Sequence, residues 1–127
     1  MMIAIVSLVN VSQVWSGKTA QAPAETVCES EDLQAVHQPH LTWMAVEELE
    51  LEGSMTELER LSRNFAPIQA SVWGYGVFPG DFPTVTLGVL KTEAIQKMHQ
   101  QLWAVLSLRA KGINAYYAPA VWMPHIT

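Results

Sequence analysis

Short hydrophobic blocks alternate with polar stretches along the chain, and the spacing within each block predicts a secondary structure. Runs that are continuously apolar, or that alternate between apolar and polar residues, predict strands at 3–9, 40–46, 70–78 and 84–90. Gly74 and Gly76 share one face of the third strand, where they permit close approach of another group. Residues 11–37 predict only a weak helix and loop, the acidic stretch 47–53 a solvated edge or loop, and residues 113–127 extended structure.

Two further segments have apolar residues three or four positions apart, as on one face of a helix. The first begins at a capping box, in which Ser54 caps and Glu57 reaches back, and ends at Pro67. The second begins at Thr92 and ends near Ala110, ahead of a stop signal at Gly112. The predicted apolar faces are Met55, Leu58, Leu61 and Phe65 in the first helix, and Ile95, Met98, Leu102, Val105 and Leu106 in the second.

The order of these elements predicts the fold class. Strands and helices mix without strict strand–helix–strand alternation, which favours an α+β fold with helices packed outside antiparallel sheets. A chain of 127 residues suits one domain.

Composition narrows the classes of function. Half of the residues are hydrophobic and 15% are charged, so a packed core is expected. The net charge of −5 argues against a long nucleic-acid track but allows a pocket that holds one phosphate. Cys28 is the only cysteine, so no intrachain disulfide forms, and a structural thiol in a reducing, cytoplasmic setting fits. The apolar N-terminus resembles a signal peptide but has no Lys or Arg before it, so we interpret it as a buried strand. No apolar run approaches the ~20 residues of a membrane helix.

One four-residue pattern, Pro-His-x-Thr, occurs twice, at 39–42 and 124–127. Because residues two apart in a strand point to the same face, His40 and Thr42 present their side chains together, as do His125 and Thr127. The apolar residue between each pair points back into the core. If both strands face one cleft, two imidazoles and two hydroxyls converge there.

That set suits phosphodiester chemistry without a metal ion or other cofactor. Histidine titrates near neutral pH, so one imidazole can take a proton from the attacking oxygen while the other gives one to the leaving oxygen. The two threonine hydroxyls can donate hydrogen bonds to the non-bridging oxygens, where negative charge develops.

The sequence resembles the two-histidine (2H) phosphoesterase superfamily, which includes the 2′-5′ RNA ligase-like proteins. The motifs "PHLT" at 39–42 and "PHIT" at 124–127 carry the resemblance, supported by "IAIVSLV", "WGYGVF", "TVTLGVLKT" and "YYAPAVWMPHIT". The resemblance implies His40 and His125 as the acid–base pair, and Thr42 and Thr127 as the phosphate-binding hydroxyls. It also implies metal-independent cleavage of a 2′,3′-cyclic or 2′-5′ phosphodiester, or 2′-5′ ligation.

The resemblance further implies two pseudo-symmetric lobes of antiparallel sheet, with outer helices around a central cleft. Members of this superfamily continue beyond the second motif. We therefore expect residues 1–127 to be a single 2H phosphoesterase-like domain whose second lobe is truncated and whose C-terminal part is missing.

Other residues have weaker signals. Tyr75 and Trp122 are candidates for stacking on a nucleobase at the rim of the cleft. His37 and His99 are interpreted as structural or solvated, and no metal-ligand spacing supports a zinc site from Cys28, His37 and His40. The expected ligand is a small nucleotide or an RNA end. Two alternatives remain: a binding module that has the cleft but no turnover, and a structural domain in which the repeat is a coincidence.

Overall fold

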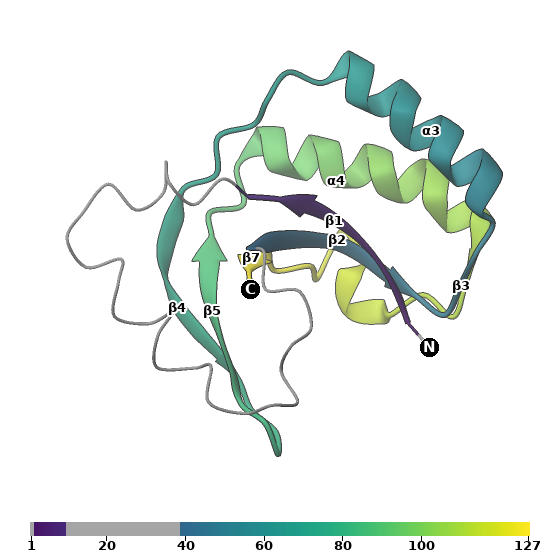
Figure 1. Ribbon diagram of the computed structural model, residues 1–127. Coiled ribbons are helices and arrows are strands. Elements are labelled where there is room, and N and C mark those ends of the chain that lie inside the picture. Colours follow the sequence, from purple (N-terminus) through teal and green to yellow (C-terminus); the bar gives the residue numbers. More distant parts are fainter. Residues whose placement is uncertain (1, 10–38) are drawn as a thin grey trace.

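The structure, a computed structural model, describes residues 2–9 and 39–127. Its centre is an antiparallel five-stranded sheet with the strand order β1, β2, β7, β5, β4 (Figure 1). The strands are β1 at Ile3–Leu8, β2 at His40–Val46, β4 at Val72–Phe78, β5 at Thr84–Val89 and β7 at His125–Ile126. The last strand therefore enters the middle of the sheet, and the predicted α+β class is confirmed.

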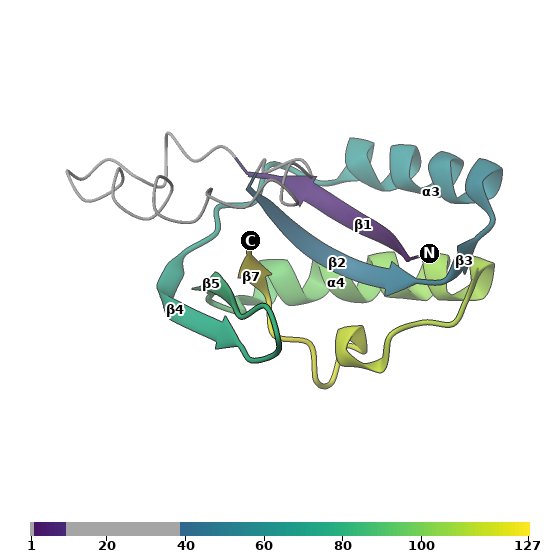
Figure 2. The same ribbon diagram turned by 60° about the horizontal axis from the view of Figure 1, so that its bottom comes forward.

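Two helices, α3 at Leu51–Asn64 and α4 at Glu93–Leu106, lie on one side of this sheet (Figure 2). Their buried faces and the facing side of the sheet form the hydrophobic core. Its buried members are Ile5, Leu41, Trp43, Met44, Val46, Leu61, Val89, Ile95, Leu102, Leu106, Trp122 and Ile126. Burial of apolar area of this kind is the main stabilising term of a fold, and it leaves the other face of the sheet for polar chemistry.

The start of α3 differs from the prediction of a capping box over Ser54–Glu57. The helix begins at Leu51, and the carboxylate of Glu50 accepts a hydrogen bond from the Gly53 backbone N–H at 2.9 Å. The guanidinium of Arg109 holds the same carboxylate at 2.9 Å. The predicted box is wrong, because the helix is capped by Glu50 and not by Ser54.

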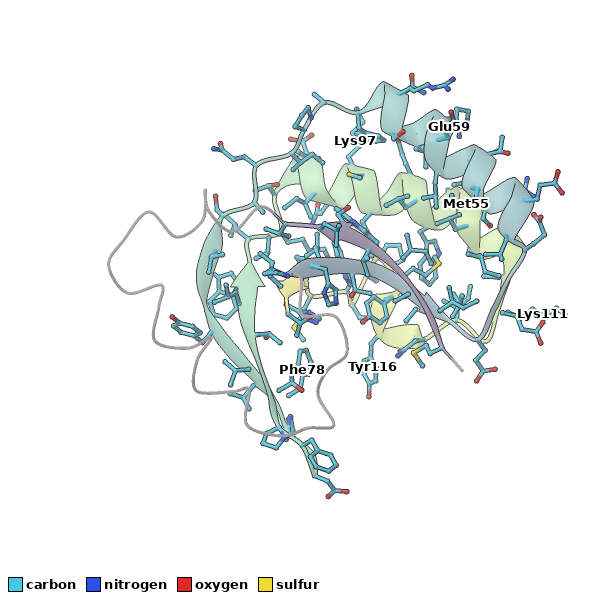
Figure 3. The ribbon with its side chains drawn as sticks, in the orientation of Figure 1. Met55, Glu59, Phe78, Lys97, Lys111 and Tyr116 are labelled. Atoms are coloured by element: carbon cyan, nitrogen blue, oxygen red, sulfur yellow. The ribbon has the colours of Figure 1, made fainter. Side chains whose placement is uncertain are left out.

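The predicted apolar face of α3 is wrong only at its first residue. Ser54 is buried, at 1% exposure, whereas Met55 is 62% exposed (Figure 3). Leu61 is buried as predicted, and Leu58 and Phe65 pack against the core.

The second helix follows its local signals closely. The hydroxyl of Thr92 accepts a hydrogen bond from the Ile95 backbone N–H at 3.3 Å, so the predicted N-cap is confirmed. The helix ends at Leu106, sooner than predicted, because a 3-10 turn occupies Ser107–Arg109. Gly112 then adopts a φ of 59°, the left-handed region that favours glycine.

A short pair of strands joins the two helices at one end. β3 at Glu48–Leu49 pairs with β6 at Ala110–Lys111, so the acidic stretch is not simply a loop. A 3-10 turn at Ala115–Tyr117 interrupts the segment expected to be extended.

Some predictions fall on residues 10–38. The weak helix and loop expected over 11–37, together with Cys28 and His37, lie outside the described residues. Within the described residues, no helix has both the length and the apolar character needed to cross a bilayer.

Candidate active site

The two Pro-His-x-Thr motifs lie side by side at the centre of the sheet. β2 and β7 pair antiparallel, with Leu41 opposite Ile126. His40 and Thr127 exchange two backbone hydrogen bonds, of 3.0 and 3.1 Å. The same register places Thr42 opposite His125. Each histidine of one motif therefore faces the threonine of the other.

This register puts all four polar side chains on one face of the sheet. Residues directly opposite one another in an antiparallel pair point to the same side, and neighbours along a strand point to opposite sides. Leu41 and Ile126 are 5% and 4% exposed and belong to the core on the helix side. His40 and His125 are diagonal neighbours on the other face, a relation in which residues lie about 7–8 Å apart and their Cβ atoms somewhat closer.

The orientation of the His125 ring is fixed by its own chain. Its Nδ1 atom lies 2.9 Å from the carbonyl oxygen of Met123. A carbonyl oxygen only accepts, so Nδ1 carries the proton and Nε2 is the nitrogen left for proton transfer. The ring of Phe78 lies against the imidazole, with centroids 4.9 Å apart at 55°.

The next strand, β5, adds residues to the same face. Gly88 lies opposite His125, and Thr86 therefore lies opposite Thr127. Thr86 is buried, and its hydroxyl donates to the carbonyl of Gly76 at 3.4 Å. The ring of Trp73 covers Gly88 so closely that a Cβ there would lie 2.4 Å from it. The expected close approach occurs at Gly76, where a Cβ would lie 3.0 Å from the Thr86 hydroxyl oxygen, but not at Gly74, where no described atom would lie within 4 Å. It also occurs at Gly88, where sequence reasoning did not expect it.

Comparison with protein families matches this chain to the 2′-5′ RNA ligase superfamily over residues 19–127. The chain belongs to that superfamily. This confirms the resemblance to the 2H phosphoesterases that the two motifs indicated. Neither the comparison with curated proteins nor the comparison with solved structures gives a match.

The two aromatic residues predicted to stack on a base do not lie on the His–Thr face of this superfamily member. Tyr75 pairs with Leu87, which pairs with Ile126, so Tyr75 points to the opposite face although it is 62% exposed. Trp122 is 2% exposed and lies in the core, where its Nε1–H donates to the Thr42 carbonyl at 3.2 Å. A ring in either position cannot stack on a ligand held by the histidines, and both predictions are corrected.

Phe78 takes the place expected for these rings. It is two residues beyond Gly76 on the same face of β4, and it projects on the side of the sheet away from the helices (Figure 3). The alternation along "GYGVF" that placed two glycines on one face could also have identified Phe78.

Tyr117 is a second residue that sequence reasoning did not select. Burial raises the pKa of its phenol, and a hydrogen bond with the Thr42 side chain partly opposes that rise. The phenol therefore stays protonated near neutral pH and contacts a hydroxyl of the first motif. The signal for this contact is tertiary, because Tyr117 belongs to a 3-10 turn far along the chain.

Proposed function

We propose that this chain is a metal-independent phosphodiesterase of the 2′-5′ RNA ligase-like type. Its substrate is a 2′,3′-cyclic or 2′-5′ phosphodiester of a nucleotide or an RNA end. The observation that carries the proposal is the register of β2 and β7, because it brings two imidazoles and two hydroxyls to one face. Membership of the 2′-5′ RNA ligase superfamily supports it.

The chemistry needs two proton transfers, and the two histidines supply them. In hydrolysis of a 2′,3′-cyclic phosphate, one neutral imidazole takes a proton from water as the water oxygen bonds to phosphorus. The bond from phosphorus to one ribose oxygen breaks, and the other imidazolium protonates that oxygen. The product is a phosphate monoester. The first histidine then releases its proton to solvent and the second takes one up, which restores both.

The threonines act on the phosphate itself. The hydroxyls of Thr42 and Thr127 donate hydrogen bonds to the non-bridging oxygens, where charge rises in the transition state. The protonated Nδ1 of His125 leaves Nε2 to face the substrate.

We extend the proposal to the surroundings of the motifs. β1 and β2 on one side of β7, and β5 and β4 on the other, are the sheets of two lobes around a cleft. The ligand is a small nucleotide or an RNA end, because the net charge of −5 does not suit a long polyanion. The single cysteine fits a reducing, cytoplasmic setting.

A pH–rate profile tests the assigned roles. The purified chain is assayed with a 2′,3′-cyclic nucleotide in EDTA, beside His40→Ala, His125→Ala and the control Lys97→Ala, whose exposed side chain lies on α4 (Figure 3). We expect a bell-shaped profile that each histidine variant loses, with a rate about 10²–10⁴-fold lower. The control should match the unaltered chain.

Two other outcomes have definite meanings. Activity that persists in either histidine variant contradicts the acid–base pair. Binding of a nucleoside monophosphate by the unaltered chain, with no product at any pH, identifies a binding module without turnover.

A further inference from the structure

The strand that carries the first motif is irregular directly after it. In the pairing of β1 with β2, Val6 lies opposite Thr42 and Ile5 lies opposite Met44, so Trp43 has no partner. This is a β-bulge, which leaves backbone groups of the extra residue outside the ladder. A buried carbonyl without a partner costs free energy, so its acceptor must be satisfied in another way.

Helix α4 supplies that partner. His99 is 2% exposed, and its Nε2 atom lies 3.1 Å from the carbonyl oxygen of Trp43. Since the carbonyl can only accept, Nε2–H is the donor. The helix thus holds the backbone one residue beyond Thr42.

The same imidazole contacts the approach to the second motif. It stacks on the ring of Trp122, with centroids 3.9 Å apart at 8°. Trp122 lies three residues before His125, and its Nε1–H donates to the Thr42 carbonyl at 3.2 Å. Its own carbonyl accepts from Lys91 at 2.9 Å, so the ring and the backbone of Trp122 are both held.

The second motif needs such support because its own strand is short. β7 has two residues, and Pro124, directly before it, has no N–H to donate. The two backbone hydrogen bonds between His40 and Thr127 fix one end of the pairing between the motifs. The other end, between Thr42 and His125, is where His99 and Trp122 act.

We propose that His99 and Trp122 are positioning residues that hold the two Pro-His-x-Thr motifs in register from behind the sheet. They never touch the substrate. They keep the Thr42 hydroxyl and the His125 imidazole within reach of one phosphate. The consequence for turnover rests on the proposed function, but the mechanical link between the motifs does not.

Neighbouring backbone amides report that link directly. The Val89 N–H donates to the carbonyl of Pro124 in the second motif at 3.0 Å, and the adjacent Leu90 N–H donates to Ser71, outside both motifs, at 2.8 Å. Loosening the second motif should speed hydrogen exchange at Val89, His40 and Thr127 and leave Leu90 unchanged. Loss of overall stability would speed exchange at all of them.

The variants separate hydrogen bonding from packing. Trp122→Phe keeps an aromatic ring against His99 but removes the donor to Thr42, and His99→Phe removes the donor to Trp43. His99→Gln retains a side-chain N–H donor. Trp103→Phe is the matched control, because that ring also lies beside His99, at 6.2 Å, and donates to neither motif in the hydrogen bonds of the described residues.

We expect Trp122→Phe and His99→Phe to speed exchange at Val89 about tenfold relative to Leu90, the effect of losing one hydrogen bond. In the cyclic-nucleotide assay, kcat should fall at least tenfold while KM changes less than about twofold. His99→Gln should keep most of the exchange protection at Val89 and most of kcat, and Trp103→Phe should alter neither of these two quantities.

The proposal is overturned if Val89 and Leu90 change together, if neither changes, or if Trp103→Phe gives the same kcat loss. Should His99→Phe fail to fold, Trp122→Phe decides alone. Selective exchange at Val89 in a protein that neither binds nor turns over nucleotides would uphold the link and reject the proposed function. Turnover of the cyclic nucleotide by the unaltered chain, without selective exchange at Val89 in the variants, would uphold the proposed function and reject the link.

Discussion

Phe78 is the side chain that makes the surroundings of His125 different from those of an ordinary polar strand. Its ring lies 4.9 Å from the imidazole, and it remains 44% exposed. A nucleobase bound on this side of the phosphate would meet an aromatic face, and stacking of a base on an aromatic residue is worth about 1–3 kcal/mol.

Phe78→Ala should therefore weaken binding of a nucleoside monophosphate by roughly 5–150-fold, which calorimetric titration can measure. Phe82→Ala is the matched control, because that ring is 91% exposed in the β4–β5 turn. Equal effects of the two substitutions would show that Phe78 makes no specific contact with the ligand.

His99 gives the molecule a pH dependence of stability that is separate from chemistry. Burial lowers the pKa of its imidazole, the hydrogen bond to the Trp43 carbonyl partly opposes this, and the nearby charge of Lys91 lowers it further. At pH values above the unfolded pKa of about 6.5, the imidazole is neutral in both the folded and the unfolded chain, and it costs no stability. Below it, the unfolded chain takes up a proton that the folded chain resists, so stability falls as the pH falls.

The difference in free energy of unfolding between pH 7.5 and pH 5.5 should thus be smaller in His99→Gln than in the unaltered chain. Urea unfolding at the two pH values measures it. An unchanged difference would mean that other groups cause the acid destabilisation.

At the scale of elements, α3 contains a buried polar group that a substitution can remove. The Ser54 hydroxyl is buried, and it has no hydrogen-bond partner among the described residues. A buried unpaired hydroxyl costs about 1–3 kcal/mol, and alanine also favours a helix.

Ser54→Ala should accordingly raise the free energy of unfolding by about 1 kcal/mol in a urea titration. Ser62→Ala, at an exposed site in the same helix, should change it by less than about 0.5 kcal/mol. A loss of stability in Ser54→Ala would indicate that the hydroxyl is satisfied in solution.

The elements that could be predicted from sequence are those whose signals are local. Thr92 and the residues that follow it contain the whole start of α4, and that prediction is confirmed. The start of α3 could not be predicted, because Ser54 and Glu57 match a capping box whereas Glu50, the residue that caps the helix, is not a preferred N-cap type. The hydrophobic runs predicted the four longer strands of the central sheet, but they indicated only extended structure for β7 and missed β3 and β6. The register of the sheet could not be predicted, and it places Tyr75 away from His125.

The same division applies to the candidate site. The repeat identified four side chains that the sheet brings to one face. It could not identify Trp122 as a core residue, because an aromatic residue near a motif fits a ligand site or a buried contact equally well. The indole of Trp122 is held inside by tertiary contacts, namely its stacking on His99 and its hydrogen bond to the Thr42 carbonyl.

On the scale of the whole molecule, the positive charges of the described residues are largely engaged away from the His–Thr face. Those in ion pairs with glutamates are Arg60, Arg63, Arg109 and Lys111, all on α3 or just beyond α4. Lys91 instead donates to two backbone carbonyls. The His–Thr face thus has little cationic support from the part of the chain that the structure describes.

Binding of a short oligonucleotide should therefore depend weakly on salt. We expect less than a tenfold loss of affinity between 50 and 200 mM salt, whereas six to ten phosphate contacts would cost about 10³–10⁵-fold. Fluorescence titrations at the two salt concentrations measure this. A steep dependence would reveal a cationic track along the RNA.

The central pairing of Leu41 with Ile126 has a geometric consequence for selectivity. A local dyad through that pair exchanges His40 with His125 and Thr42 with Thr127. The four groups by themselves cannot distinguish a phosphodiester from the same phosphodiester turned end over end. Directionality must come from neighbours that break the dyad, and the ring of Phe78 beside His125 is one of them. Under the proposed function, residues beside the two motifs, and not the motifs themselves, would therefore set the polarity of the substrate.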